Sequence, residues 1–389
     1  MQVKEEQHKG HKHAPVDHGK WSVKVKETDK DAQAKESGLR AVACTTDSVL
    51  IASAPVVKVW QLAEDKLQES AKLRVGLLGA SSVEVSETGN VALVVGRDGS
   101  IGIWDLRENK RTETQAFAED VFATSAKFLR GEQEIAWTSS LNSIHTLDLR
   151  SGSTQAYGSD PEGRLAKRRR TQDDLPPPFT FSTSRPDRET VFNFGVSPDG
   201  SWIGCGRGSG IVSLFEVAHS KWTGDIRTHV GQADTQSSCW RKAPGKKGAV
   251  ESTAVRAVCF DATSSFLASG GDDGKIAVID IREASGSSSS SAGPRAKFVH
   301  SAAAHAKQVS SMAMCPCRTA EAHDIQSMLV STDLGGTVKL WDIHHQTPFQ
   351  SFQEHSLAAL ASAFAPNGKF FVTVGADAAL ALFTRQAPE

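Results

Sequence analysis

One pattern recurs seven times along this chain: two short apolar strands joined by a tight turn. The clearest copy is VALVVGRDGSIGIWDL, residues 91–106, in which Asp98 and Gly99 separate the strands and Trp104 lies near the end of the second. Asp-Gly between alternating runs predicts a β-hairpin, because both residues tolerate the positive φ of a type I′ turn. The other copies are VLIASAPVVKVWQL, EIAWTSSLNSIHTLDL, SWIGCGRGSGIVSLFEV, FLASGGDDGKIAVIDI, MLVSTDLGGTVKLWDI and FFVTVGADAALALF.

A further short alternating segment precedes each hairpin, and we expect it to form the innermost strand of the same sheet. These segments are Ser22–Val25, Ser82–Val85, Ser125–Phe128, Asn193–Val196, Ala257–Phe260, Ser311–Met314 and Ala361–Phe364. With one more outer strand, each unit becomes a four-stranded antiparallel blade, and seven blades close into a ring. The prediction is an all-β chain, a single seven-bladed β-propeller over 1–389, with blades near 17–62, 80–106, 122–149, 191–217, 254–282, 308–343 and 359–384.

The last copy ends at Phe383, so its outermost strand does not follow it in the sequence. We expect residues 2–7 to supply that strand, because a strand from the N-terminus would cover the edge of a half-built blade. The alternative is that residues 2–7 form a disordered tail.

Three copies contain extra chain. Trp60 and Trp104 are 44 residues apart, whereas the equivalent Leu147 and Phe215 are 68 apart. The additional residues are rich in Pro, Arg, Asp, Gly, Lys or Ser, a composition that cannot form a core, and we expect surface loops. These predicted insertions are 151–188, 222–252 and 284–298.

Composition and motifs argue against several functional classes. Lys and Arg total 44 and Asp and Glu 45, which gives no global attraction to nucleic acid or membrane. No G-x-S-x-G elbow, phosphate loop or His-Glu metal motif is present, so we predict a non-enzyme without cofactors, although catalytic residues could still converge from distant blades. A metal site is not expected, because the histidines of the N-terminal tail lack fixed geometry: His8, His11, His13 and His18.

The pairs Trp104-Asp105 and Trp341-Asp342, with His18, His305 and His355 ahead of predicted inner strands, resemble the WD-repeat family. That resemblance implies a hydrogen-bonded chain of histidine, serine or threonine, turn aspartate and tryptophan within a blade. In this sequence no copy carries the complete set; the sixth has Gly335 where the aspartate is expected. We therefore expect cohesion to depend on apolar packing between blades.

A narrower resemblance is carried by DHGKWSV (17–23), VVKVWQLAEDKLQ (56–68) and PNGKFFVTVGADAALALF. These segments resemble the WD-repeat subunits shared by the superkiller complex, a helper of the cytoplasmic RNA exosome, and the polymerase-associated-factor elongation complex. The resemblance implies a non-catalytic scaffold for mRNA decay or transcription elongation. It would grip a helical-repeat (tetratricopeptide-type) protein in the cytoplasm and nucleus, and meet RNA or chromatin only through the complex. The alternatives are an adaptor of another complex, such as a chromatin or methyltransferase complex, and a nucleic-acid binder.

Two positions in each blade face the narrow opening of a propeller: the residue before the inner strand and the residue before the central turn. Large apolar groups beside arginines at such positions are typical of a protein-binding surface. The predicted partner-binding residues are Trp21, Arg97, Phe192, Arg207, Arg256, Asp272, Leu334 and Leu360. The alternatives are packing under neighbouring loops for the apolar members and pairing with local carboxylates for the arginines.

A basic run lies in the first insertion: Lys167, Arg168, Arg169 and Arg170. Such a run is what a nuclear import signal or a nucleic-acid contact requires. The alternative is a solvated loop with no such role.

Overall fold

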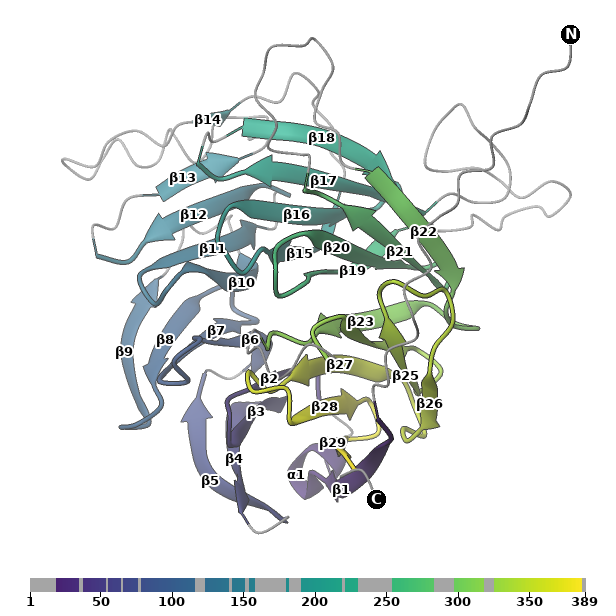
Figure 1. Cartoon of the computed structure of the whole chain (residues 1–389). Coiled ribbons are helices and arrows are strands. Elements are labelled where there is room, and N and C mark those ends of the chain that lie inside the picture. Colours follow the sequence, from purple (N-terminus) through teal and green to yellow (C-terminus); the bar gives the residue numbers. More distant parts are fainter. Residues whose placement is uncertain are drawn as a thin grey trace, which may run out of the picture.

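The strands of the computed structural model form seven sheets arranged around a central axis (Figure 1). The structure describes residues 19–34, 38–53, 55–63, 66–75, 78–115, 123–139, 142–150, 154–157, 180–181, 190–218, 221–229, 254–282, 297–317 and 325–386.

Each sheet is one blade, and in six of them the strands follow one another outward in chain order. The first three blades contain β2 (Ala41–Cys44), β3 (Ser48–Ser53), β4 (Val56–Ala63), β5 (Lys66–Arg74); β6 (Ala80–Val85), β7 (Val91–Gly96), β8 (Ile101–Asp105), β9 (Lys110–Gln115); and β10 (Ala123–Arg130), β11 (Glu134–Ser139), β12 (Ile144–Asp148), β13 (Thr154–Tyr157). The next three contain β15 (Val191–Val196), β16 (Trp202–Arg207), β17 (Ile211–Glu216), β18 (Lys221–Arg227); β19 (Val255–Phe260), β20 (Phe266–Gly271), β21 (Lys275–Asp280), β22 (Lys297–Ala303); and β23 (Val309–Met314), β24 (Met328–Asp333), β25 (Thr337–Asp342), β26 (Gln350–Gln353).

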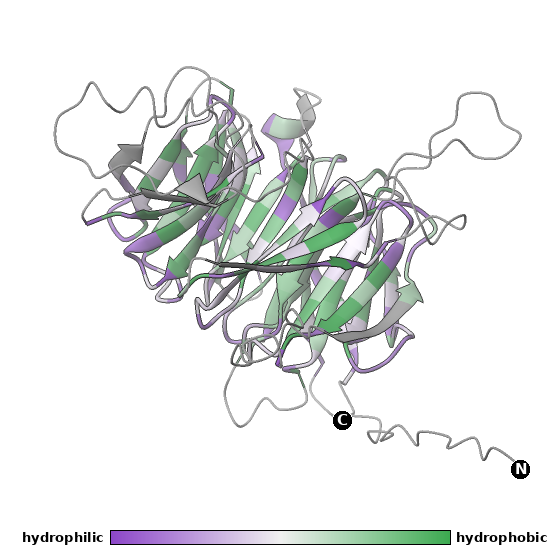
Figure 2. Ribbon diagram, turned by 90° about the horizontal axis from the view of Figure 1, so that it is seen from above, coloured by the Kyte–Doolittle hydropathy of each residue, from purple (hydrophilic) through white to green (hydrophobic). Residues whose placement is uncertain are grey.

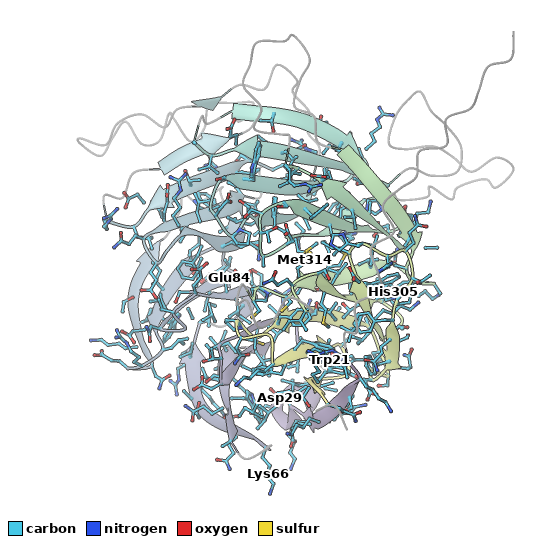
Figure 3. The ribbon with its side chains drawn as sticks, in the orientation of Figure 1. Trp21, Asp29, Lys66, Glu84, His305 and Met314 are labelled. Carbon is cyan, nitrogen blue, oxygen red and sulfur yellow. The ribbon has the colours of Figure 1, made fainter. Side chains whose placement is uncertain are left out.

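The inner strands surround the axis as a closed ring. Each inner strand contacts the next one around the ring, in the order β2, β6, β10, β15, β19, β23 and β27 (Ala359–Phe364). The last of these, in the seventh blade, contacts β2 again. Figure 3 shows Glu84 of β6 and Met314 of β23 near the centre of the ring and Lys66 of β5 at its periphery. The predicted seven-bladed propeller with four antiparallel strands per blade is confirmed.

The ring is closed by β1 (Trp21–Thr28), which completes the seventh blade after β28 (Phe370–Gly375) and β29 (Ala379–Arg385). Trp21 pairs with Arg385 and Thr28 with Ala379, so β1 runs antiparallel to β29. Closure by an N-terminal strand is therefore confirmed, but the closing strand is 21–28; residues 2–7 lie outside the described residues.

The same pairing corrects the first blade. Ser22–Val25 belongs to the outermost strand of the last blade and not to the innermost strand of the first, which is β2. The predicted first blade, 17–62, therefore begins too early. A short helix, α1 (Lys30–Ala34), lies between the two strands. Both β1 and an inner strand alternate in polarity, so alternation alone does not distinguish them.

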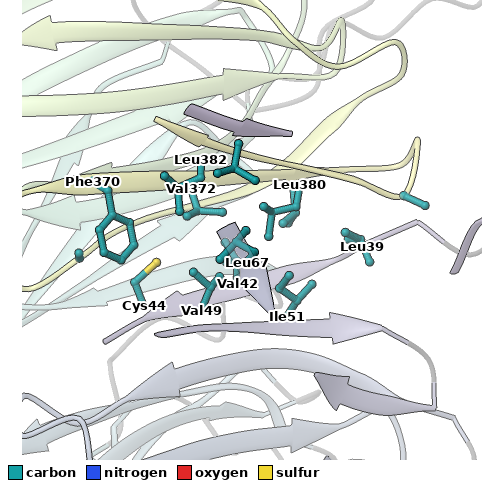
Figure 4. Packing of buried hydrophobic residues seen from close by; sticks show 14 of the residues in the cluster. Leu39, Val42, Cys44, Val49, Ile51, Leu67, Phe370, Val372, Leu380 and Leu382 are labelled. Atoms are coloured by element: carbon teal, nitrogen blue, oxygen red, sulfur yellow. The ribbon is translucent and has the colours of Figure 1, made fainter. Parts of the chain in front are cut away.

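Packing between adjacent blades forms the core. Between the seventh and first blades, Val372, Leu380 and Leu382 share a buried cluster with Val49 and Ile51 (Figure 4). Burial of one such side chain contributes about 1.5–3 kcal/mol. Figure 2 shows hydrophobic residues concentrated within the strands and hydrophilic residues near their ends and in the turns. Cohesion by apolar packing between blades is thus visible in the structure.

Parts of the three predicted insertions form strands. Residues 151–188 contain β13 and also β14 (Thr180–Phe181), a fifth strand that pairs in parallel with β13. Residues 222–252 overlap β18, and 284–298 overlap the start of β22. These outer strands occur where the sequence is polar, and they lack the apolar alternation that identifies a strand with one buried face. Most of the remaining inserted residues lie outside the described ranges.

The sixth blade brings together all four members of the chain that the resemblance implies, a set that the sequence did not reveal. Nε2 of His305 lies 2.7 Å from Oγ of Ser331, which accepts a hydrogen bond of 2.8 Å from Nε1 of Trp341. Nδ1 of His305 lies 3.2 Å from Oδ2 of Asp333. The expectation that no blade carries all four members was wrong, because Asp333 at the end of β24 supplies the carboxylate that Gly335 cannot.

Partial chains occur in the fifth and seventh blades. His229 lies 2.8 Å from Asp273 and 3.1 Å from Ser269. In the seventh blade His355 lies 3.1 Å from Asp377 and 2.9 Å from Thr373. Ile279 and Phe383 stand where the tryptophan would be. These contacts tie each incoming loop to the central turn of its blade.

Candidate protein-binding rim

One end of the ring, here called the upper rim, consists of the loops that lead into the inner strands and the central turns of the blades. Six of the seven inner strands bulge at the same position beside this rim. In β15, for example, Val191 pairs with Arg207 and Asn193 with Gly206, so Phe192 is passed over. A bulge redirects the extra side chain. The bulged residues are Ser81, Thr124, Phe192, Arg256, Ser310 and Leu360.

The equivalent position in the first blade is Arg40, and not Trp21. The backbone N–H of Arg40 donates a hydrogen bond of 3.3 Å to the carbonyl of Ala52, and the side chain is exposed. Trp21 is only 1% exposed and lies in the last blade, where its ring centroid is 5.4 Å from that of Phe371 (Figure 3). The predicted rim position of Trp21 is therefore wrong, because its strand is the closing strand of the ring.

Three predicted site residues meet where the fourth and fifth blades adjoin. Arg256 donates two hydrogen bonds to the Asp272 carboxylate, from Nε at 2.7 Å and Nη2 at 2.9 Å. Its guanidinium carbon lies 4.0 Å from the centre of the Phe192 ring. A cation over an exposed ring contributes about 0.5–1 kcal/mol. Asp272 thus orients Arg256, and Arg256 covers one face of Phe192, which remains 43% exposed.

The other two predicted arginines differ from each other. Arg207 is half-buried and its Nε donates to Oγ of Ser213, which in turn donates to Asp225 of β18. Arg207 therefore holds strands of its own blade together. The side chain of Arg97 is exposed in the central turn of the second blade. Of this pair, Arg97 is the more exposed.

Exposed apolar side chains gather at the upper rim. Among the described residues four large hydrophobic side chains are exposed, and all four lie in rim loops, turns or bulges: Leu78 at 59%, Phe192 at 43%, Leu334 at 43% and Leu357 at 57%. Leu360 nearby is half-buried. Leu78 and Leu357 were not among the predicted site residues. They lie two residues before β6 and β27, and a leucine in the loop that enters an inner strand was the available signal.

The turn that carries Leu334 is fixed against the loop that carries Leu357. Gly336 has a φ of 85°, and a side chain there would meet the carbonyl oxygens of His355 and Leu357, the latter at 2.6 Å from its Cβ. Nε2 of Gln353 donates to the carbonyls of Gly335 at 3.0 Å and His355 at 3.2 Å. The two leucines are therefore presented by a rigid support.

Titratable groups below this rim are largely buried. Burial lowers the pKa of His305, against the opposing effect of the nearby Asp333 carboxylate. The pKa of Asp377 is also lowered: its burial acts in the opposite direction but is outweighed by hydrogen bonds from His355 and the backbone of Ser356. His305 and Asp377 have a structural role, because each contacts a partner within its own blade.

Several predicted residues lie outside the described ranges, namely His8, His11, His13, His18, Lys167, Arg168, Arg169 and Arg170. Within those ranges no three potential metal ligands cluster. The described elements also include no helix with the length and apolarity needed to cross a membrane.

Comparison with protein families gives one match. Residues 246–280 match the family model described as WD domain, G-beta repeat, and this segment includes β19, β20 and β21 of the fifth blade. No curated protein matches the chain. The repeat match and the seven-bladed ring together support a WD-repeat family for this chain.

Proposed function

We propose that this chain is a non-catalytic WD-repeat scaffold that binds another protein through its upper rim. The observation that carries the proposal is the location of Leu78, Phe192, Leu334 and Leu357, all the exposed large hydrophobic side chains of the described residues, at one end of the ring. Exposed apolar groups gathered at one end of a molecule, with arginines among them, are characteristic of interaction surfaces. A WD-repeat propeller is typically a non-enzymatic platform for such contacts.

Preorganisation strengthens this proposal. Phe192 is held by the Arg256 guanidinium, and the contacts around Gly336 fix the backbone segments that carry Leu334 and Leu357. A side chain that is already fixed loses less conformational entropy when a partner binds. An aromatic ring beside an arginine is also a frequent centre of binding energy.

We propose further that the chain is a subunit of a superkiller-type mRNA-decay complex or a polymerase-associated-factor elongation complex. Its partner would be a helical-repeat protein of the tetratricopeptide type, in the cytoplasm and the nucleus. The support is the sequence resemblance of residues 17–23, 56–68 and the C-terminal hairpin to subunits of that group. RNA and chromatin would be reached through the complex.

The test is affinity capture of the full chain from its native cells, comparing wild type with Phe192→Ser and Leu357→Ser. We expect both variants to lose helical-repeat subunits that the wild type retains. Lys369→Ser is the control, because Lys369 is exposed in the turn between β27 and β28 at the opposite end of the ring. Equal capture by all four proteins, with unchanged thermal unfolding, would refute a binding role for the upper rim.

A further inference from the structure

The upper rim is not uniform, and its chemistry in the sixth, seventh and first blades points to a particular kind of partner. We infer that this part of the rim, the leucine–cation patch, binds an acidic protein segment with apolar anchor residues. The patch consists of Leu334, Leu357, Leu360, Lys307 and Arg40. The inference rests on the proposed function and specifies the partner of that surface.

The apolar half of the patch is preformed. Leu334 and Leu357 are 43% and 57% exposed and lie on a turn and a loop that touch at Gly336. Leu360 is the bulged residue of the adjoining inner strand. Such a cluster accepts apolar side chains of a partner with little reorganisation.

Two cations border the leucines. A Cβ added at Gly335 would lie 3.2 Å from Cγ of Lys307, which places the Lys307 side chain beside the turn of Leu334. On the other side, the backbone N–H of Leu39 donates a hydrogen bond of 2.9 Å to the carbonyl of Gly375, and Arg40 follows immediately. Both side chains are exposed, and no carboxylate of the described residues forms an ion pair with either.

The carboxylates beside the turn of Leu334 and the loop of Leu357 are largely buried: the side chains of Asp333 and Asp377 are 2% and 10% exposed. Asp333 accepts hydrogen bonds from the backbone of Gly335 and Thr337, at 2.9 and 2.8 Å, and faces His305. Asp377 is bound by His355 at 3.1 Å.

Two further carboxylates toward the outer strands are also paired. Glu354 lies 3.4 Å from Lys26, and Asp31 lies 2.8 Å from Lys58. The exposed charges of the patch itself are those of Lys307 and Arg40, and both are positive. Carboxylates on a partner would be attracted to them, and lysines would be repelled.

The experiment uses two synthetic fluorescent peptides with leucines at identical positions, one carrying glutamates and the other lysines between them. Fluorescence anisotropy with the full chain measures both dissociation constants at about 50 and about 300 mM NaCl. We expect the glutamate peptide to bind at least about tenfold more tightly at the lower salt concentration and to weaken at the higher one.

Charge-reversal variants test whether Arg40 and Lys307 cause the preference for the glutamate peptide. Arg40→Glu combined with Lys307→Glu should weaken the glutamate peptide about tenfold or more. Lys369→Glu at the opposite end should leave its affinity unchanged. Equal binding of the two peptides, binding of neither, or indifference to the double reversal would overturn the inference.

Capture from native cells separates this inference from the proposed function. If Leu357→Ser loses the partner but the double charge reversal keeps it, the rim binds protein and the acidic specificity is wrong. If both variants keep the partner, the proposed function fails as well.

Discussion

Nζ of Lys58 lies 2.7 Å from Oδ1 of Asp29, and both side chains are 4% exposed. Lys58 belongs to β4 of the first blade, and Asp29 follows β1, the closing strand of the seventh. The same carboxylate oxygen accepts the backbone N–H groups of Asp31 and Ala32 at the start of α1. Burial acts to lower the pKa of Lys58, but the hydrogen bonds from Lys58 to Asp29 and Asp31 outweigh it. The pKa is therefore raised, and the amine stays charged. This ion pair joins the two blades at the point where the ring closes.

Lys58→Met should destabilise the protein by about 3–5 kcal/mol, because it leaves the Asp29 carboxylate buried without its cation. Urea unfolding at neutral pH measures the change. Lys72→Met is the matched control: Lys72 lies 3.1 Å from Glu69 and 3.7 Å from Asp31 but is 48% exposed, and its loss should cost less than about 1 kcal/mol. Similar losses for both variants would show that burial of the Asp29–Lys58 pair is unimportant.

Stability should fall as the pH drops below about 6.5, partly because of His305. Burial lowers the pKa of His305 in the folded protein. Above this pH the imidazole is neutral in both states and contributes no pH dependence; below it the unfolded chain takes up a proton that the folded protein resists. Urea midpoints at several pH values should therefore decline more steeply for the wild type than for His305→Gln. Parallel curves would contradict a lowered pKa at this position.

Trp341→Phe should cost about 1–2 kcal/mol more than Trp104→Phe. Both rings are buried at equivalent positions, 3% and 6% exposed. Nε1 of Trp341 donates to Ser331, whereas Nε1 of Trp104 is buried without a hydrogen-bond partner. Only the first substitution breaks a hydrogen bond. Chemical denaturation of the two variants measures the difference, and a larger loss for Trp104→Phe would refute it.

Trp21→Ala should destabilise by roughly 3–5 kcal/mol, the usual cost of emptying a buried aromatic position. Hydrogen exchange followed by mass spectrometry should show the greatest loss of protection in β1 and β29, the strands that Trp21 and Arg385 join. Amides of the fourth blade, on the other side of the ring, serve as the internal reference. A uniform loss of protection around the ring would mean that closure is no weaker than any other blade contact.

The sequence was sufficient to predict seven blades, because hairpins with strong apolar strands repeat at a recognisable interval. It misassigned the first inner strand for a physical reason. Ala41–Cys44 reads AVAC, four small apolar residues that are all buried and show no alternation, whereas Trp21–Thr28 alternates clearly. Alternation reports one solvated face, and a strand packed on both faces lacks it.

The candidate rim was partly predictable. Phe192 and Arg256 were identified because each lies at a fixed offset within its blade, but their contact joins two blades whose sequences are far apart. The exposure of Leu357 is set by the conformation of its loop, which no repeated sequence pattern predicts. His229 was missed because residues 230–253 separate it from the blade that it stabilises.

Ring closure through β1 and β29 also sets an order of events during synthesis. The first strand of the structure to leave the ribosome pairs with the last. At about 5–20 residues per second, β1 waits tens of seconds without its neighbour while the other six blades are made. In a nascent chain halted before Ala379, β28 therefore has an open outer edge and β1 has no strand to pair with. Such a chain is the form in which this protein is most vulnerable to aggregation, and only its final strand removes the hazard.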